Sequence, residues 1–158
     1  MPLIAGGVAF ALALTIGAIG VRGRIWQEAA PTEGRVTVSA AKLSGKTNEE
    51  RIAFLATHGW SVSSEQIEIL EVIIPEKFDE IYTTYNEMQI AQGFDLSNVA
   101  GRRCKRYSYR VENYPNTEEP VRAHVLVYKD KIIGGDVTSE IAGGFMHGLT
   151  MPQAQTVE

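Results

Sequence analysis

The N-terminal part of the chain is a long apolar run without a charged residue. Residues 3–21 read LIAGGVAFALALTIGAIGV, and a helix of about 19 residues spans about 28 Å, close to the hydrocarbon thickness of a bilayer. A secretory signal usually has a shorter apolar part and a clear cleavage site, and Ala18-Ile19-Gly20 is only a weak one. We therefore predict an uncleaved transmembrane anchor over residues 1–21.

The charges beside this run give opposing indications of its orientation. No Lys or Arg precedes the run, whereas Arg22 and Arg24 follow it, and by the positive-inside rule this favours a cytoplasmic domain. A short N-terminal anchor ahead of one domain is, however, most often an export arrangement. We expect a single-pass protein of the cell membrane with an extracytoplasmic globular domain.

The pattern then changes from a polar tether to an amphipathic helix. Residues 22–46 have little apolar periodicity and are rich in small and polar residues, as a tether would be. Thr47 and Glu50 have the spacing of a capping box, and Gly59 provides the left-handed stop after His58. These signals predict a helix over residues 48–58 at the start of the globular domain.

A strand and a second helix are predicted next. Residues 66–75, QIEILEVIIP, are dense in β-branched residues and predict a buried strand that ends at Pro75, which can open the following helix. Apolar residues then recur at three- and four-residue spacings, so we expect one stripe against the sheet: Phe78, Ile81, Tyr85 and Met88. Gly93 ends this helix.

The rest of the pattern alternates with the period of a strand. Residues 102–114 place Tyr107, Tyr109 and Val111 on one face, and residues 121–130 do the same with alternate apolar residues. A turn at residues 129–131 leads to a third strand over residues 132–139. We predict an α+β fold in which two helices pack on one face of a mostly antiparallel sheet of about four strands. The predicted globular domain covers residues 47–150, and residues 151–158 form a disordered tail.

Composition adds little to this picture. The 158 residues carry a formal net charge of −4, which gives no overall attraction to nucleic acid. Cys104 is the single cysteine, so an internal disulfide is excluded, and we expect it to be a small, half-buried strand residue. We expect no cofactor and no nucleic-acid partner.

The glycine-rich segment IIGGDVTSEIAGGFMHGL, residues 132–149, raises the question of a phosphate site. A phosphate cradle needs glycines between a strand and a helix N-terminus, whereas Gly134 and Gly135 lie inside a predicted strand. We expect Gly135 to admit a close neighbour in the core and Gly134 to face the more polar side. The following tail is predicted to fold across the sheet and bury three apolar residues: Phe145, Met146 and Leu149.

Two histidines and an aspartate suggest an alternative with a metal. His124, Asp136 and His147 would supply two nitrogens and a carboxylate, which suits zinc in a hydrolase or accessory enzyme. Their sequence spacing does not support a site, and no nucleophile motif is present. We therefore expect no metal site and no enzyme, and keep the hydrolase as the alternative. A second alternative is an inhibitor that acts through the glycine-rich tail.

The polar face of the predicted sheet carries a basic stripe. If the strands pair as neighbours, the stripe consists of Arg102, Arg106, Arg110, Arg122 and His124. Nearby Glu112, Glu118, Glu119 and Asp136 could balance it as an ordinary solvated face. As a binding site it would attract an anionic lipid, a wall polymer or an acidic protein.

Several segments together resemble a known family. A GW pair after the first helix is followed by YNEMQIAQGFDLS, YSYRVENYP, VRAHVLVYKDKIIGGDV and GGFMHGL. This order resembles a family of small membrane-anchored proteins of Gram-positive bacteria that is known only as a domain of unknown function. The likeness covers residues 48–149 and implies no activity. The sequence thus favours a membrane-anchored interaction or sensory module that is not an enzyme.

Overall fold

The computed structural model describes residues 43–153 and contains an antiparallel five-stranded sheet with two α-helices. The strands β1 (Glu68–Ile73), β2 (Arg103–Arg110), β3 (Val121–Tyr128), β4 (Lys131–Ser139) and β5 (Met146–His147) lie in the order β1-β2-β3-β4-β5. The helices are α2 (Asn48–Thr57) and α3 (Glu80–Ala91), and a short 3-10 helix, η2 (Leu96–Val99), follows α3. The predicted α+β class is confirmed.

Helix α2 forms where its capping signals predicted. The Thr47 side chain accepts from the Glu50 N–H, and the Glu50 carboxylate accepts from the Thr47 N–H. Gly59 follows the C-cap with φ +91°, a conformation that glycine adopts without strain. The capping box and the glycine stop are thus both confirmed.

The hairpin between β3 and β4 is also as predicted. Tyr128 pairs with Lys131, which leaves a two-residue turn of Lys129 and Asp130 with φ values of 46° and 62°. Positive φ at both central residues is the requirement of a type I′ turn, whose twist suits a hairpin.

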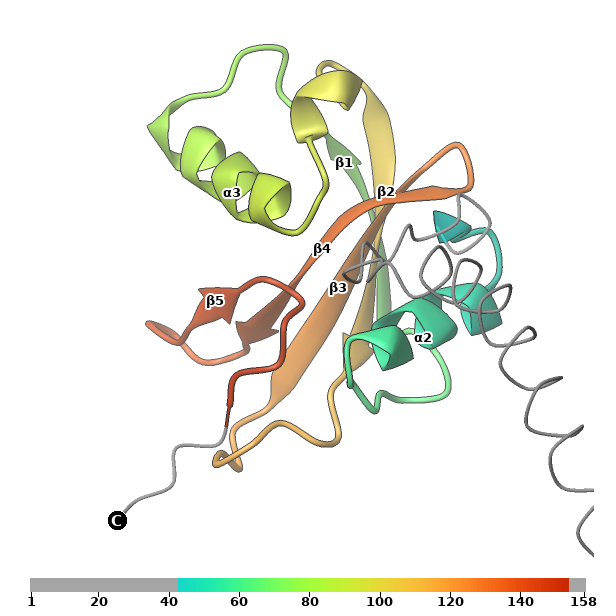
Figure 1. Ribbon diagram of the computed structural model, residues 1–158, viewed down its shortest axis with the longest axis vertical. Coiled ribbons are helices and arrows are strands. Elements are labelled where there is room, and N and C mark those ends of the chain that lie inside the picture. Colours follow the sequence, from blue (N-terminus) through green and yellow to red (C-terminus); the bar gives the residue numbers. More distant parts are fainter. Residues whose placement is uncertain (1–42, 154–158) are drawn as a thin grey trace, which may run out of the picture. The chain divides into compact units, whose positions relative to one another are not determined.

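The prediction that both helices cover one face of the sheet is wrong. Helix α2 packs through Phe54 and Leu55 on a core that includes Tyr109 and Val125. The opposite face carries a second, smaller core of Ile74, Leu96, Val99, Cys104 and Leu126, against which Tyr82 and Tyr85 of α3 pack. Figure 1 shows the two helices on opposite sides of the sheet. The sheet is therefore buried on both faces, because apolar residues also occupy the second face of β2 and β3.

Helix α3 starts later and is rotated relative to the prediction. Asp79 caps it by accepting from the Tyr82 N–H at 2.7 Å, so the helix does not start at Pro75. Ile81 is 81% exposed, which contradicts its place in the predicted buried stripe, whereas Phe78 and Tyr85 of that stripe do pack on the second core. The buried positions of α3 are instead the polar Asn86 and Gln89, which hydrogen-bond to buried backbone groups.

Strand β1 was predicted to be buried, and this is also wrong. It lies at the edge of the sheet, where β2 is its only neighbour among the described strands. Ile69 and Ile73 are 50% and 63% exposed. β-Branched density indicates a strand, but it does not distinguish a central strand from an edge.

The tail closes the α2 side of the sheet in part as predicted. Leu149 is fully buried, and its carbonyl accepts from Trp60 Nε1 at 2.7 Å. Phe145 is partly buried against the same core. Met146 is 55% exposed, which contradicts its predicted burial. The tail therefore folds back through β5 and Leu149.

The predicted membrane anchor and most of the tether lie outside the described residues. Within residues 43–153, no helix has the length and apolar character needed to cross a bilayer. Ser44 at the end of the predicted tether forms a bridge with Lys131, and Met151 packs on the α2 core.

Candidate functional site: a charged pocket between α3 and the sheet

An open pocket of about 390 Å³ lies on the α3 face of the sheet, where four strands and α3 contribute polar side chains. The register of the strands explains this gathering, because Ser108 of β2 lies opposite His124 of β3, and His124 lies opposite Asp136 of β4. Residues opposite each other in antiparallel strands share a face. The pocket is lined by Glu68, Tyr85, Arg106, Arg122, His124, Asp136, Thr138, Ser139, Glu140 and Met146.

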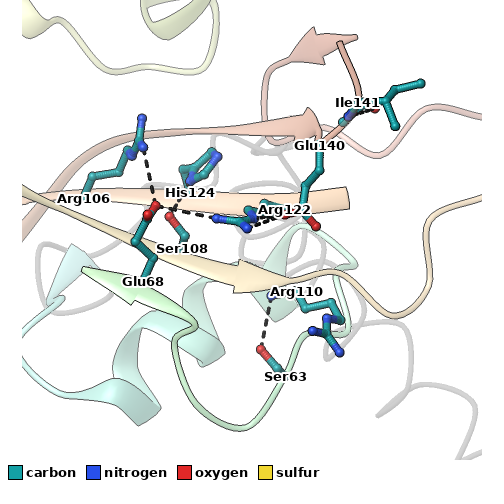
Figure 2. Close-up of polar contacts among 10 residues, drawn as sticks. Ser63, Glu68, Arg106, Ser108, Arg110, Arg122, His124, Glu140 and Ile141 are labelled. Atoms are coloured by element: carbon teal, nitrogen blue, oxygen red, sulfur yellow. Dashed lines mark hydrogen bonds and ion pairs between the residues drawn. The ribbon is translucent and has the colours of Figure 1, made fainter. Parts of the chain in front are cut away.

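Two arginines on neighbouring strands meet at one carboxylate. Glu68 Oε2 lies 3.7 Å from Arg106 Nη2 and 3.6 Å from Arg122 Nη1, as Figure 2 shows. All three side chains are about one-third exposed. An exposed ion pair of this length contributes about 0–1 kcal/mol. Glu68 therefore holds a position between the guanidiniums without binding them tightly.

The two arginines differ in how firmly they are held. Arg122 donates from Nε to Glu140 Oε1, and its Nη2 forms an ion pair with the same oxygen, which orients its guanidinium. Arg106 has no such partner, and its buried Nε makes no hydrogen bond with any described residue. A buried donor without an acceptor is unfavourable by about 1–3 kcal/mol. Arg106 is thus the less satisfied cation of the pocket.

His124 lies at the centre of the pocket and is nearly buried. Its Nδ1 is 2.8 Å from the Ser108 hydroxyl, which is itself fully buried. Burial lowers the pKa of His124 most, and Arg106 and Arg122 lower it further, while Asp136 and Glu68 oppose this shift. The neutral imidazole is therefore favoured in the folded protein.

Asp136 forms the acidic wall of the pocket. Tyr85 donates to Asp136 Oδ2 at 2.7 Å, and Thr138 donates to Oδ1 at 2.9 Å. Burial and the adjacent Asp136 carboxylate raise the pKa of the Tyr85 hydroxyl, so it remains a hydrogen-bond donor. The Tyr85 bond connects α3 to β4, and the Thr138 bond orients the carboxylate within β4.

The structure assembles only part of the predicted basic stripe. Arg106, Arg122 and His124 share the pocket, whereas Arg102 is exposed just before β2. Arg110 is exposed at the end of β2, where its N–H donates to Ser63 (Figure 2). Sequence reasoning missed Glu68, Tyr85 and Glu140. Glu68 and Tyr85 lie on elements whose orientation was predicted incorrectly, and Glu140 follows the end of β4.

The charges of the pocket also differ from the expected balance. Glu68 and Glu140 pair with the arginines, rather than Glu112, Glu118 or Glu119. With a neutral His124, two guanidiniums face three carboxylates, counting Asp136. The arginines can therefore take up an external anion only by exchanging an internal carboxylate.

The three residues of the metal alternative do not come together. His147 pairs with Val137, which belongs to the α2 core, and its Nε2 lies 2.9 Å from the Tyr114 hydroxyl. It therefore lies on the opposite face of the sheet from His124 and Asp136. Among residues 43–153, no group of three His, Cys, Asp or Glu side chains is placed to hold a metal ion.

Two potential nucleophiles of β2 are buried. The Ser108 hydroxyl contacts His124 but has no exposed surface. Cys104 is 2% exposed, and burial raises the pKa of its thiol, which disfavours the reactive thiolate. Its predicted place in a strand is confirmed, whereas the expected half-burial is not, because the side chain packs in the second core.

The glycine-rich segment does not form a phosphate cradle. Gly134 and Gly135 are residues of β4, and the chain continues as strand through Ser139. The Gly135 N–H donates to Gln89 Oε1, and the Gly135 carbonyl accepts from Gln89 Nε2. These backbone groups are thus already occupied by α3.

Comparisons with known proteins give one match. The model of a family described as Domain of unknown function (DUF4830) matches residues 54–137. These residues run from the second half of α2 into β4 and include six of the ten residues that line the pocket, among them Arg106, Arg122 and His124. No curated protein and no solved structure matches the chain.

Proposed function

We propose that this chain, which belongs to the family described as Domain of unknown function (DUF4830), is a binding module without catalytic activity. Its site is the pocket of Arg106, Arg122 and His124, which receives an anionic group of a partner. Partners of this chemistry include anionic lipids, wall polymers and acidic proteins. The apolar run of residues 3–21 would anchor the module in the cell membrane with the domain outside the cytoplasm.

The observation that carries this proposal is the position of Glu68. Its carboxylate contacts both guanidiniums at 3.6–3.7 Å, so the space between the arginines accepts an anion. Glu68 is the first residue of the edge strand β1 and is about one-third exposed. Its side chain can therefore leave without disturbing a core contact, and a partner's anion takes its place.

The neighbouring residues prepare the two arginines for different roles. Glu140 fixes Arg122, which lowers the entropy lost on binding. Arg106 brings a buried Nε without a partner among the described residues, and a bound anion would supply the missing acceptor. The burial of Ser108 and Cys104 and the absence of a three-ligand metal group within residues 43–153 favour binding over catalysis.

Binding of anionic polymers by the purified 158-residue chain tests this proposal. The probes are polyglutamate and vesicles of phosphatidylglycerol, with phosphatidylcholine vesicles as the neutral reference. We expect Arg106→Ala to weaken binding of an anionic probe about tenfold, because one charge-assisted hydrogen bond is lost. Glu68→Gln should strengthen it severalfold, because the internal competitor is removed.

Arg103→Ala is the matched control. Arg103 lies on the same strand, its side chain is 66% exposed, and it pairs with Glu71 outside the pocket. It changes the net charge as Arg106→Ala does, and we expect less than a twofold effect. Equal losses from the two variants, or no binding of either anionic probe, would refute the pocket as the site.

A further inference from the structure

Strand β1 combines an edge that no other strand of residues 43–153 covers with exposed apolar side chains in and just before the strand. Ile67, Ile69, Leu70 and Ile73 are 39–63% exposed, and they are half of the exposed large hydrophobic residues in the described part of the chain. Natural edge strands are usually protected by charges, proline or a covering segment. Here Glu68 and Glu71 are the charged residues, and both are engaged with arginines on β2.

Some backbone N–H and C=O groups of β1 point away from β2 and can pair with another strand. The Ile74 N–H donates to the Arg102 carbonyl on the β2 side at 2.9 Å. Backbone groups alternate in direction along a strand, so Ile69, Glu71 and Ile73 direct their N–H and C=O groups away from β2. These groups have the spacing needed to pair with one more antiparallel strand.

The sequence of β1 is complementary to itself in an antiparallel register. With a two-fold axis at Leu70, Ile67 lies opposite Ile73, and Ile69 lies opposite Glu71 of the second copy. Glu68 lies opposite Val72, so no two glutamates oppose each other. Ile69 and Glu71 form the hydrogen-bonded pairs in this arrangement, as the direction of their backbone groups requires. A register centred on Glu71 would instead oppose two like charges, which is unfavourable.

We infer that two copies of this chain pair through β1, antiparallel and centred on Leu70. The two sheets become one continuous sheet of ten strands across a two-fold axis. The pairing satisfies the outward backbone groups of β1 and buries the isoleucines at both ends of the strand. The pocket lies on one face of the sheet and shares Glu68 with β1, whereas the pairing uses the backbone groups of Ile69 and Glu71.

Disulfide trapping tests the register in the full chain. In a Cys104→Ala background, Leu70→Cys places two thiols opposite each other at the axis, in a pair without hydrogen bonds whose side chains are close. We expect Leu70→Cys to form a covalent dimer under mild oxidation. Val72→Cys, on the same strand and face, is the matched control and should not, because its two copies are about 13 Å apart along the strand.

A second variant tests the dimer without cysteines. Ile73→Lys changes a side chain that is 63% exposed, so it should leave the fold intact by circular dichroism and shift the sedimenting species to the monomer. Ile90→Lys, on α3 and 53% exposed, should remain a dimer. A wild-type chain that stays monomeric at high micromolar concentration would overturn the inference, as would cross-linking through Val72 but not Leu70.

Discussion

Gly134 and Gly135 are adjacent residues whose surroundings differ because they face opposite sides of β4. A Cβ on Gly135 would lie 2.6 Å from the His124 carbonyl oxygen and 3.1 Å from Leu149 Cδ1. A Cβ on Gly134 would lie 2.7 Å from Gln89 Oε1 and 3.3 Å from its Cδ. The first clash involves backbone and a core side chain, and the second involves the end of one side chain.

Gly135→Val should therefore destabilise the domain more than Gly134→Val. We expect a loss of about 3 kcal/mol or more for Gly135→Val, because neither the His124 backbone nor Leu149 has room to move. The loss for Gly134→Val should be about 1–3 kcal/mol, since Gln89 must move. Urea denaturation of both variants measures the difference. Equal, negligible losses would contradict the packing explanation.

The lowered pKa of His124 leads to a second prediction at the residue scale, which concerns the pH dependence of stability. Burial holds the folded-state pKa below the usual value of 6.5. As the pH falls below about 6.5, His124 binds a proton in the unfolded chain but not in the folded chain, so the free energy of unfolding decreases. The decrease continues until the pH reaches the folded pKa, with a slope of at most about 1.4 kcal/mol per pH unit.

Denaturation midpoints between about pH 7.5 and pH 5.5 check this behaviour. His124→Gln should remove the dependence in that range, although it will also lower the overall stability. His58→Gln is the control, because His58 lies at the end of α2, away from the pocket. A slope that persists in His124→Gln would assign the titration to another group.

At the scale of elements, α3 is attached to the sheet by polar bonds as much as by apolar packing. β5 pairs with β4 only at Val137 and Thr138. The next backbone groups of β4 on the β5 side are those of Gly135, and they bind the Gln89 amide instead of a strand. Gln89 thus takes the place of a neighbouring strand residue, which explains why a polar side chain lies on the buried side of α3.

Gln89→Ala should consequently detach α3 from β4. The Gly135 N–H would lose its acceptor in a buried position, and we expect a loss of about 2–4 kcal/mol. Glu87→Ala, on the exposed side of the same helix, should change the stability by less than about 0.5 kcal/mol. Thermal and urea denaturation measure both values. A neutral Gln89→Ala would mean that apolar contacts alone hold α3.

At the scale of the whole molecule, the C-terminal tail completes the core on the α2 side. Trp60 is 2% exposed, and its indole stacks on Tyr114 at 5.6 Å between ring centroids. Tyr114 in turn stacks on Phe145 at 4.8 Å. The tail therefore covers a core that residues 43–142 cannot close by themselves.

Removal of residues 143–158 should prevent the domain from folding. In a Trp26→Phe background, the Trp60 emission should shift toward that of free indole, because the Leu149 carbonyl and the stacked rings are lost. Met146→Ser, at a 55% exposed position of the same tail, should keep the native emission. A truncated chain that stays folded but loses a binding partner would instead support the inhibitor that acts through the tail.

The sequence determined the local features of this protein. Thr47, Glu50 and Gly59 specify α2, because capping is an interaction between residues three or four positions apart. Alternation specifies β2 and β3, and the same period places Arg106, Arg122 and His124 on one face. These features depend only on near neighbours or on the strand period, so they can be read without knowledge of the fold.

Only the tertiary structure decided which surfaces are covered. The exposure of β1 depends on the absence of a sixth strand beside it within residues 43–153, and periodicity does not report a missing neighbour. The buried Gln89 follows from backbone groups of β4, 46 residues away in sequence. Glu68 meets Arg106 and Arg122 through pairings set by the strand order. Burial and ion pairing are properties of distant segments in contact, and neither is present in the local pattern.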